Sequence, residues 1–248
     1  MGYHYENAPI TEALIDIRVE PLSQSMRPAL SDLYERVKLQ YPDRQEQFVV
    51  GAQLSFGSEV TTQTSQTPLG FAFRSKDGKQ IFQARLNGFT VSRLKPYRNW
   101  PELLEQAREL WGHYRAAIGP QQITRVAVRY INQIDIPVRS LDYKDYFLTT
   151  PEVSPKLPQT LSGFFMQLQL PQPDIHGTLI LTQTAVPPPA PGMNSVILDV
   201  DVFQDAPDFA SDDQVWDVLE KLRERKNKYF EGCLTDKTRA LFGKRRMY

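Results

Sequence analysis

Residues 125–134, RVAVRYINQI, carry side chains suited to holding a charged or polar ligand. Their alternation of branched and polar residues predicts a β-strand whose successive side chains point to opposite faces. Arginine binds carboxylates and phosphates through a planar fork of donors. Arg129, Gln133 and Asp135 therefore predict a binding surface on one face, while Asn132 interrupts the otherwise apolar opposite face.

A structural interpretation of the same strand stays open. Asn132 is a residue type that satisfies backbone groups at a bulge. Arginines on a half-exposed strand commonly pair with carboxylates across the sheet. The expected pairs are Asp16 with Arg129, or Glu20 with Arg125.

The predicted binding residues come from this strand and from two earlier segments. They are Arg18, Arg93, Tyr97, Arg129, Tyr130 and Asn132. We predict no catalytic residues, no cofactor and no metal ligands, because the chain contains no P-loop, G-x-G-x-x-G, G-x-S-x-G or H-E-x-x-H signature.

The remaining reactive side chains have plainer interpretations. His113 is expected to be a partly exposed helix residue, and the single cysteine, Cys233, a buried and unreactive thiol. The helix residues Arg223, Lys226 and Lys228 are expected to form a solvated basic face.

Composition excludes several classes of protein. The 248 residues include 29 Lys plus Arg and 29 Asp plus Glu, so the net charge is zero and a bulk electrostatic nucleic-acid binder is disfavoured. One cysteine fits a reducing, cytoplasmic location. The start lacks the pattern of a signal peptide, and no apolar run approaches the roughly 18 residues that span a bilayer.

Hydrophobic periodicity predicts strands and helices in a mixed order. Strands are expected over 10–21, 47–57, 70–75, 79–86, 89–97, 123–138, 163–170, 176–186 and 194–203. Helices are expected over 25–41, 99–120 and 211–234, with short helices within 140–147 and 235–248. The polar, Thr- and Gln-rich segment 58–68 is expected to be a loop.

This order predicts an α+β fold in which two halves, about 1–120 and 121–248, repeat one plan within a single domain. Each half reads strand, helix, several strands, helix. Together they predict one long antiparallel sheet with the helices packed on one face. The order of elements resembles the TATA-binding-protein saddle and, more loosely, the helix-grip fold, which implies shape and not function.

Four motifs also resemble those of a known family. They are P-I-x-E-A at 9–13, S-R-L-x-P-Y-x-x-W at 92–100 and R-Y-x-N-x-I at 129–134, with a C-terminal F-x-x-x-L-T-D at 230–236. The chain resembles a sporadically distributed bacterial family of uncharacterised proteins roughly 260 residues long. The resemblance implies no catalytic residues. Such a distribution implies a defence or toxin–antitoxin-like locus, where a protein acts beside a neighbour's product.

Three functions follow as hypotheses. The first is a non-enzymatic cytoplasmic protein that binds a partner protein, encoded nearby or a second copy of itself, through the open sheet face with Arg18, Arg93, Tyr97 and Arg129. The second is a small-molecule or nucleotide-binding protein or enzyme with a pocket between sheet and helices, where Arg93, Arg129 and Tyr130 hold an anion. The third, nucleic-acid binding by the sheet face, ranks lowest because its charges are mixed in sign.

Overall fold

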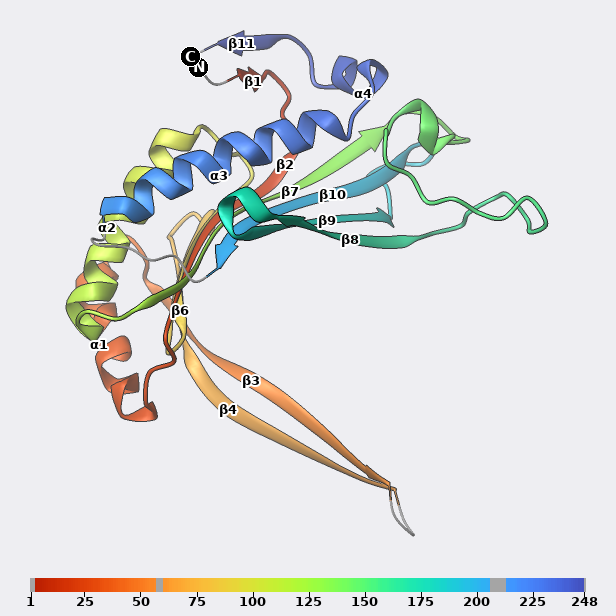
Figure 1. Ribbon diagram of the computed structural model, residues 1–248. Helices are drawn as coiled ribbons and strands as arrows, with labels where there is room; N and C mark the ends of the chain where they lie inside the picture. Colours follow the sequence, from red (N-terminus) through yellow and green to blue (C-terminus); the bar gives the residue numbers. More distant parts are fainter. Residues whose placement is uncertain (1–2, 57–59, 206–212, 248) are drawn as a thin grey trace. The chain divides into compact units, whose positions relative to one another are not determined.

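The computed structural model describes residues 3–56, 60–205 and 213–247, and Figure 1 shows their arrangement into strands and helices. The described residues form a nine-stranded antiparallel sheet of order β3-β4-β5-β6-β2-β7-β10-β9-β8 and a two-stranded sheet, β1-β11. The strands of the large sheet are β2 (Ile10–Val19), β3 (Asp43–Phe56), β4 (Val60–Arg74), β5 (Gln80–Arg85), β6 (Gly88–Leu94), β7 (Ile123–Ile136), β8 (Phe165–Gln172), β9 (Gly177–Val186) and β10 (Asn194–Asp205).

Four α-helices accompany these strands in the described part of the chain. They are α1 (Arg27–Val37), α2 (Trp100–Ile118), α3 (Asp213–Gly232) and α4 (Asp236–Leu241). Short 3-10 helices occupy Gln24–Met26, Tyr143–Asp145 and Pro173–Ile175. None of the described helices is both long and apolar enough to cross a membrane.

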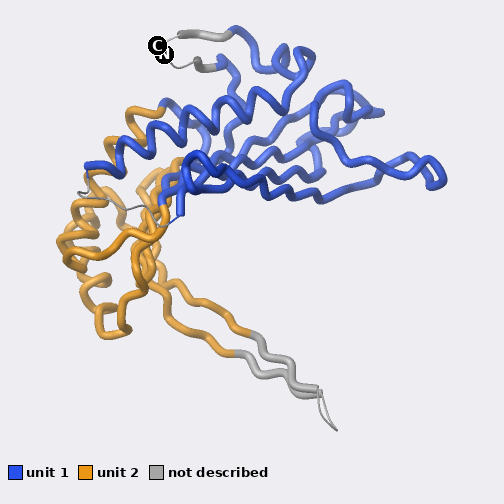
Figure 2. The backbone as a smooth tube through the Cα atoms, in the orientation of Figure 1, with its two compact units in different colours: residues 1–15, 94–99, 126–248 blue, residues 16–93, 100–125 orange. Residues whose placement is uncertain are grey.

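The α+β class and the long antiparallel sheet are confirmed, and the elements follow the predicted order. That order is strand, helix, four strands and helix, followed by strand, short helix, three strands and helix. The proposed relation between the two halves as an internal repeat stays a prediction. Contacts divide the chain into two compact units, coloured in Figure 2: unit 1 (1–15, 94–99 and 126–248) and unit 2 (16–93 and 100–125).

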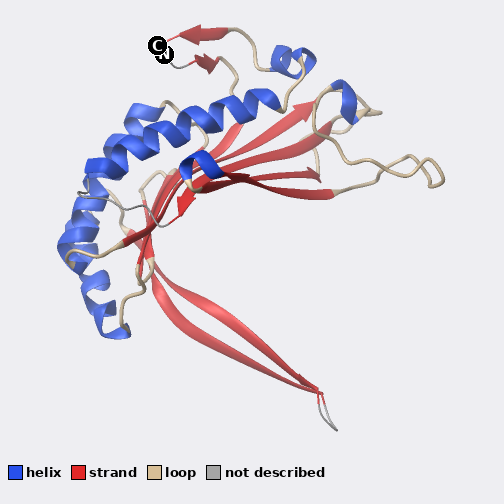
Figure 3. Cartoon of the chain, viewed as in Figure 1, coloured by secondary structure: helices blue, strands red, loops and turns tan. Residues whose placement is uncertain are grey.

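Unit 2 builds its core from aromatic side chains between its strands and its two helices. Phe73 on β4 stacks with Phe82 on β5, with ring centroids 5.2 Å apart. Phe89 on β6 meets Trp111 of α2 edge to face, with ring centroids 5.6 Å apart. Figure 3 shows α1 and α2 on one side of these strands, where their apolar stripes are buried. Gly88 begins β6 directly after the two-residue turn Leu86–Asn87, and a side chain is excluded there because a Cβ would lie 2.6 Å from the Ile17 carbonyl oxygen.

The long β3–β4 hairpin of unit 2 corrects one prediction. Residues 60–68 of the expected polar loop belong to β4, and residues 58 and 59 lie outside the described part of the chain. The two strands pair antiparallel from Asp43↔Arg74 to Phe56↔Val60, with a register shift at Gln47/Phe48. Threonine is β-branched and favours extended backbone, so a polar Thr-rich segment can pair as a strand when a partner strand is adjacent.

Unit 1 packs α3 against β10, and β10 pairs in turn with β9 and β9 with β8. The chain ends meet in this unit, where β1 (Tyr3–Tyr5) pairs with β11 (Arg245–Met247). Within unit 1, β7 alternates as predicted: Val128, Tyr130, Asn132, Ile134 and Ile136 are buried, whereas the residues between them are partly exposed. The buried face of β7 therefore carries Tyr130 and Asn132, and the other face carries Arg129.

Candidate ligand-binding site

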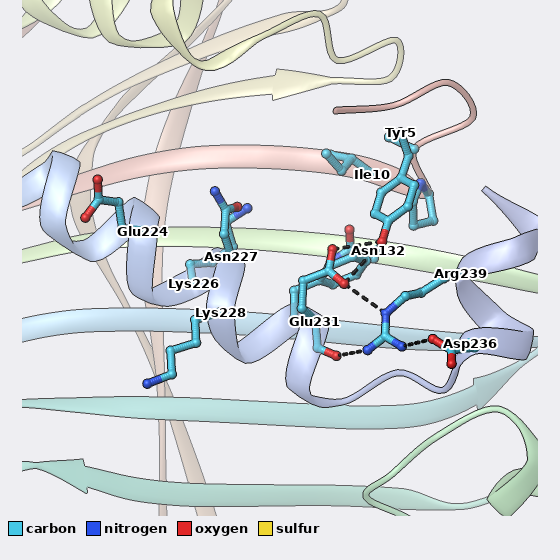
Figure 4. Close-up of a pocket in the computed structure, with 13 residues that line it drawn as sticks. Tyr5, Ile10, Asn132, Glu224, Lys226, Asn227, Lys228, Glu231, Asp236 and Arg239 are labelled. Carbon is cyan, nitrogen blue, oxygen red and sulfur yellow. Dashed lines mark hydrogen bonds and ion pairs between the residues drawn. The ribbon is translucent and has the colours of Figure 1, made fainter. Parts of the chain in front are cut away.

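A cavity of about 720 Å³ lies within unit 1, among α3, α4, the segment before β2 and the buried face of β7. Figure 4 shows the side chains that line it. Ala8, Pro9, Ile10 and Phe230 supply apolar surface, and Asn132 is contributed by β7. Side chains from both ends of the sequence thus meet at one hollow.

Lys226 is the unusual member of this lining. Its residue is only 6% exposed, and its Nζ lies 3.5 Å from the centroid of the Tyr130 ring. The ammonium forms neither a hydrogen bond nor an ion pair with any residue in 3–56, 60–205 or 213–247. A buried ammonium without an acceptor is expensive, since its lost hydration is not replaced.

Burial lowers the pKa of Lys226 to about 7, and the nearby charge of Arg223 lowers it further, against a weaker opposing effect of Glu231. The aromatic face of Tyr130 attracts a cation, but such a contact is worth about 2 kcal/mol when desolvated. Removing an unpaired ammonium from water costs several kcal/mol. The cost of desolvation is therefore larger than the gain from the aromatic ring, and a large fraction of Lys226 is a neutral amine near pH 7.

Lys226 corrects the prediction of a solvated basic face. The buried residues of α3 include Val215, Leu219, Leu222 and Phe230, and Lys226 lies four residues from each of the last two. It therefore occupies a core position of the helix. The sequence contained this signal, because the apolar stripe has a gap at the position where Lys226 stands.

A hydrogen-bonded cluster fixes the wall of the cavity next to Lys226. The Tyr5 hydroxyl donates to Glu231 Oε1 over 2.9 Å, and Arg239 Nε donates to Glu231 Oε2 over 3.0 Å. Arg239 also donates to the Glu231 carbonyl oxygen over 2.7 Å and to Asp236 Oδ1 over 2.6 Å. Figure 4 shows Glu231 between Tyr5 and Arg239. Both carboxylate oxygens of Glu231 are thus engaged with groups other than Lys226.

Two of the predicted binding residues lie at this cavity: Asn132 lines it, and the ring of Tyr130 contacts Lys226. The hydroxyls of Tyr97 and Tyr130 lie 2.7 Å apart, and their rings meet edge to face. Asn132 Nδ2 donates to the carbonyl oxygens of Tyr130 and Leu198, over 3.3 and 3.0 Å. The amide of Asn132 thus ties β7 to β10, which agrees with the structural interpretation of this residue.

Arg129 is paired and lies on the opposite face of β7 from Tyr130. Its Nε and Nη2 donate to the two carboxylate oxygens of Asp199, at 2.9 and 2.5 Å. The expected Asp16–Arg129 pair is therefore wrong, because Asp199 on the neighbouring strand β10 takes this guanidinium. Since Arg129 and Tyr130 point to opposite faces, their side chains do not converge on one anion, contrary to the second hypothesis.

Arg18 and Arg93 belong to unit 2. Arg18 is exposed and its Nε lies 3.3 Å from Asp16 Oδ2. Arg93 lies on the same face of β6 as Phe89 and Val91. That face packs towards α2, so Arg93 does not lie on the open face where it was predicted. The six predicted residues therefore do not form one site; Tyr97, Tyr130 and Asn132 are brought together in unit 1.

A charge cluster around Asp16 occupies the open face of unit 2. Asp16 Oδ1 accepts from Arg85 Nη2 and from the Thr90 hydroxyl, each over 2.6 Å, and Oδ2 accepts from Arg125 Nη1 over 3.0 Å. Burial alone would raise the pKa of Asp16, but Arg85, Thr90 and Arg125 together hold it below its usual value. Arg125 thus pairs with Asp16, and the expected Glu20–Arg125 pair is not the one found.

The other reactive groups behave as ordinary structural residues. Cys233 is buried, and burial raises the pKa of its thiol to about 11, as expected for an unreactive cysteine. His113 is partly exposed on α2. Among the described residues no group of three or more His, Cys, Asp or Glu side chains is placed to hold a metal ion.

The chain matches none of the known protein families, curated proteins or solved structures with which it was compared. The resemblance suggested by the four sequence motifs stays a prediction.

Proposed function

We propose that the chain binds a small molecule in the unit 1 cavity and that an oxygen atom of the ligand accepts a hydrogen bond from Lys226. The observation that supports this is Lys226, a residue that lines the cavity, is only 6% exposed, and whose Nζ has no acceptor among the described residues. A perturbed ionisable group in a cleft is a general mark of a functional site. A carbonyl or carboxylate oxygen would supply the missing acceptor.

The size and chemistry of the cavity suit such a ligand. Small-molecule sites commonly have volumes of about 300–1,000 Å³, and this cavity holds about 720 Å³. Its apolar wall of Pro9, Ile10 and Phe230 can bury a hydrocarbon portion. Because Glu231 and Arg239 bond to each other, Lys226 is the group that would select the polar end of the ligand.

A thermal-shift panel of small carboxylates, aldehydes and ketones tests this function. Ligand at one hundred times its dissociation constant stabilises a protein by about 2.7 kcal/mol. A compound that raises the Tm of the wild type should leave Lys226→Met unchanged. It should still stabilise Lys228→Met, because Lys228 lines the same cavity on the same helix but is exposed. Equal stabilisation of wild type and Lys226→Met would contradict the proposal.

A second candidate, binding of a partner protein in the cytoplasm, is favoured by one observation in unit 2. Strand β3 lies at an edge of the sheet and exposes three consecutive apolar residues, Phe48, Val49 and Val50. An edge strand offers unpaired backbone groups to an extended segment of another chain, and exposed apolar residues add affinity.

The partner-binding candidate predicts a stoichiometric complex in pull-downs from the native host, or a dimer in light scattering if the partner is a second copy. Val50→Lys should abolish that complex. Leu39→Lys is the matched control, since Leu39 is an exposed apolar residue outside the strand. A monomer that recovers no stoichiometric protein would rule this candidate out.

A further inference from the structure

We infer that Lys226 is a nucleophile: its Nζ adds to the carbonyl carbon of an aldehyde or ketone ligand and forms an imine. This inference rests on the proposed function, because the carbonyl compound must first enter the unit 1 cavity. It names the chemical class of the ligand and a covalent step that simple hydrogen bonding does not require.

The geometry leaves the amine available for this step. A lysine engaged with a carboxylate is held as an ammonium and has no lone pair to donate. Lys226 has no carboxylate partner in the described ranges, and the nearest acidic side chain that influences it, Glu231, is bonded to Tyr5 and Arg239. Its contact is the Tyr130 ring, which accepts no covalent bond and occupies no lone pair of the amine.

The reaction balances without any further reactant. The Nζ lone pair attacks the carbonyl carbon, and the C–O π electrons move to oxygen to give a carbinolamine. Loss of the carbinolamine oxygen as water, with the two hydrogens of the amine, leaves a C=N bond in place of C=O. No electron is gained or lost overall. Glu224 and Lys228 line the cavity and are exposed, so solvent reaches the cavity. Water molecules therefore carry the protons.

The surroundings of Lys226 match those of known imine-forming lysines in general chemical terms. Such lysines are activated by desolvation or by a neighbouring cation. Here burial and Arg223 both act in that direction, so the lowered pKa supports what the geometry indicates. Each pKa unit below the usual value of about 10.4 raises the neutral fraction at pH 7 about tenfold.

Lys228 provides an internal comparison within the same molecule. Both lysines are on α3 and both line the cavity, but Lys228 is exposed and Lys226 is buried. A reaction governed by general accessibility favours Lys228. A reaction governed by a desolvated, neutral amine favours Lys226.

The test is reductive trapping on the full chain. The protein is incubated with butanal or with 2-oxobutanoate and cyanoborohydride at pH 7, and the modified lysines are identified by peptide mass spectrometry. We expect Lys226 to be labelled at least about tenfold faster than Lys228, given its larger neutral fraction. Lys226→Arg should lose this adduct, and Lys221→Arg, at an exposed position of α3 outside the cavity lining, should keep it. Labelling of surface lysines alone, or labelling of both lysines at one rate, overturns the inference.

A matched ligand separates failure of this inference from failure of the proposed function. Butanoate has a similar size but forms no imine with an amine. If butanoate or 2-oxobutanoate stabilises the wild type but not Lys226→Met, while no adduct forms, the cavity binds ligands and the covalent step is wrong. If no compound of either class stabilises or labels the protein, both are wrong. The rate ratio within the wild type needs no variant, so it remains decisive even if Lys226→Arg folds poorly.

Discussion

Asp16 in unit 2 and Lys226 in unit 1 are both charged residues that are only 6% exposed, yet their surroundings differ. Asp16 receives hydrogen bonds from Arg85, Arg125 and the Thr90 hydroxyl. Lys226 faces an aromatic ring and a cavity. A buried charge whose bonds are all made within the fold belongs to the structure. A buried charge without an acceptor in the described chain suggests that a ligand supplies the missing acceptor.

The largest expected effect comes from breaking the satisfied cluster. Asp16→Ala leaves the guanidinium groups of Arg85 and Arg125 without their shared carboxylate, and these side chains are largely buried. The free energy of unfolding should fall by about 3–5 kcal/mol in urea denaturation. Asp32→Ala, at an exposed position of α1, is the control and should change it by no more than about 0.5 kcal/mol. A loss below about 1 kcal/mol for Asp16→Ala would show that the cluster is not a structural centre.

The opposite sign is expected at the unsatisfied charge. Lys226→Met keeps a similar shape, removes the desolvated amine and fills a core position of α3. The free energy of unfolding at pH 7 should rise by on the order of 2 kcal/mol, measured by urea denaturation. Lys228→Met, the exposed neighbour, should change it by no more than about 0.5 kcal/mol. A Lys226→Met variant that is less stable than the wild type would mean that a partner stabilises the Lys226 ammonium in the folded protein.

A pH series sharpens this difference. The pKa of Lys226 is about 7 in the folded protein and about 10.4 when unfolded, so between these values the unfolded state binds more protons. Wild-type stability should therefore rise with pH across this window relative to Lys226→Met. Below pH 7 both states are protonated and the penalty is complete. The difference between the two proteins should shrink by about 2 kcal/mol from pH 7 to pH 9. A difference that is constant with pH would mean that Lys226 titrates alike in both states.

The smallest effect is expected at Arg129, which is paired but less buried. Its side chain is 41% exposed, so solvent screens the pair with Asp199. Arg129→Ala should reduce the free energy of unfolding by about 1 kcal/mol, mainly because Asp199 remains in a largely buried position. Arg129→Ala should leave ligand binding in the unit 1 cavity unchanged, since Arg129 does not line it. A selective loss of ligand binding would show that Arg129 takes part in the binding site.

Periodicity predicted the architecture well because most elements bury one face. The alternation along β7 and the apolar stripes of α1 and α2 arise because one face of each element is buried. The strands and helices of the fold can therefore be predicted from periodicity. The segment 60–68 is predicted as a loop because its sequence is mostly polar and does not alternate between apolar and polar residues. Its extended conformation comes from pairing with β3, a contact that local sequence does not specify.

The candidate site was harder to predict for a related reason. The sequence predicts Lys226 on the solvated face of its helix because lysine is rarely buried, although its spacing from Leu222 and Phe230 places it on the core face. The arginines were recognised as ion-pair partners, but which carboxylate each one meets depends on strand register. Asp16 with Arg125 and Asp199 with Arg129 became evident only once the strands were paired.

The titration of Lys226 in the ligand-free protein tests the central claim most directly. Lysine labelled with 13C at the ε carbon gives one NMR signal per lysine, and the Lys226 signal is identified by its loss in Lys226→Met. We predict that its chemical shift titrates with a midpoint near pH 7, because burial destabilises the ammonium and no acceptor compensates. A midpoint near 10.4, together with the surface lysines, would show a solvated or paired ammonium and would contradict the account.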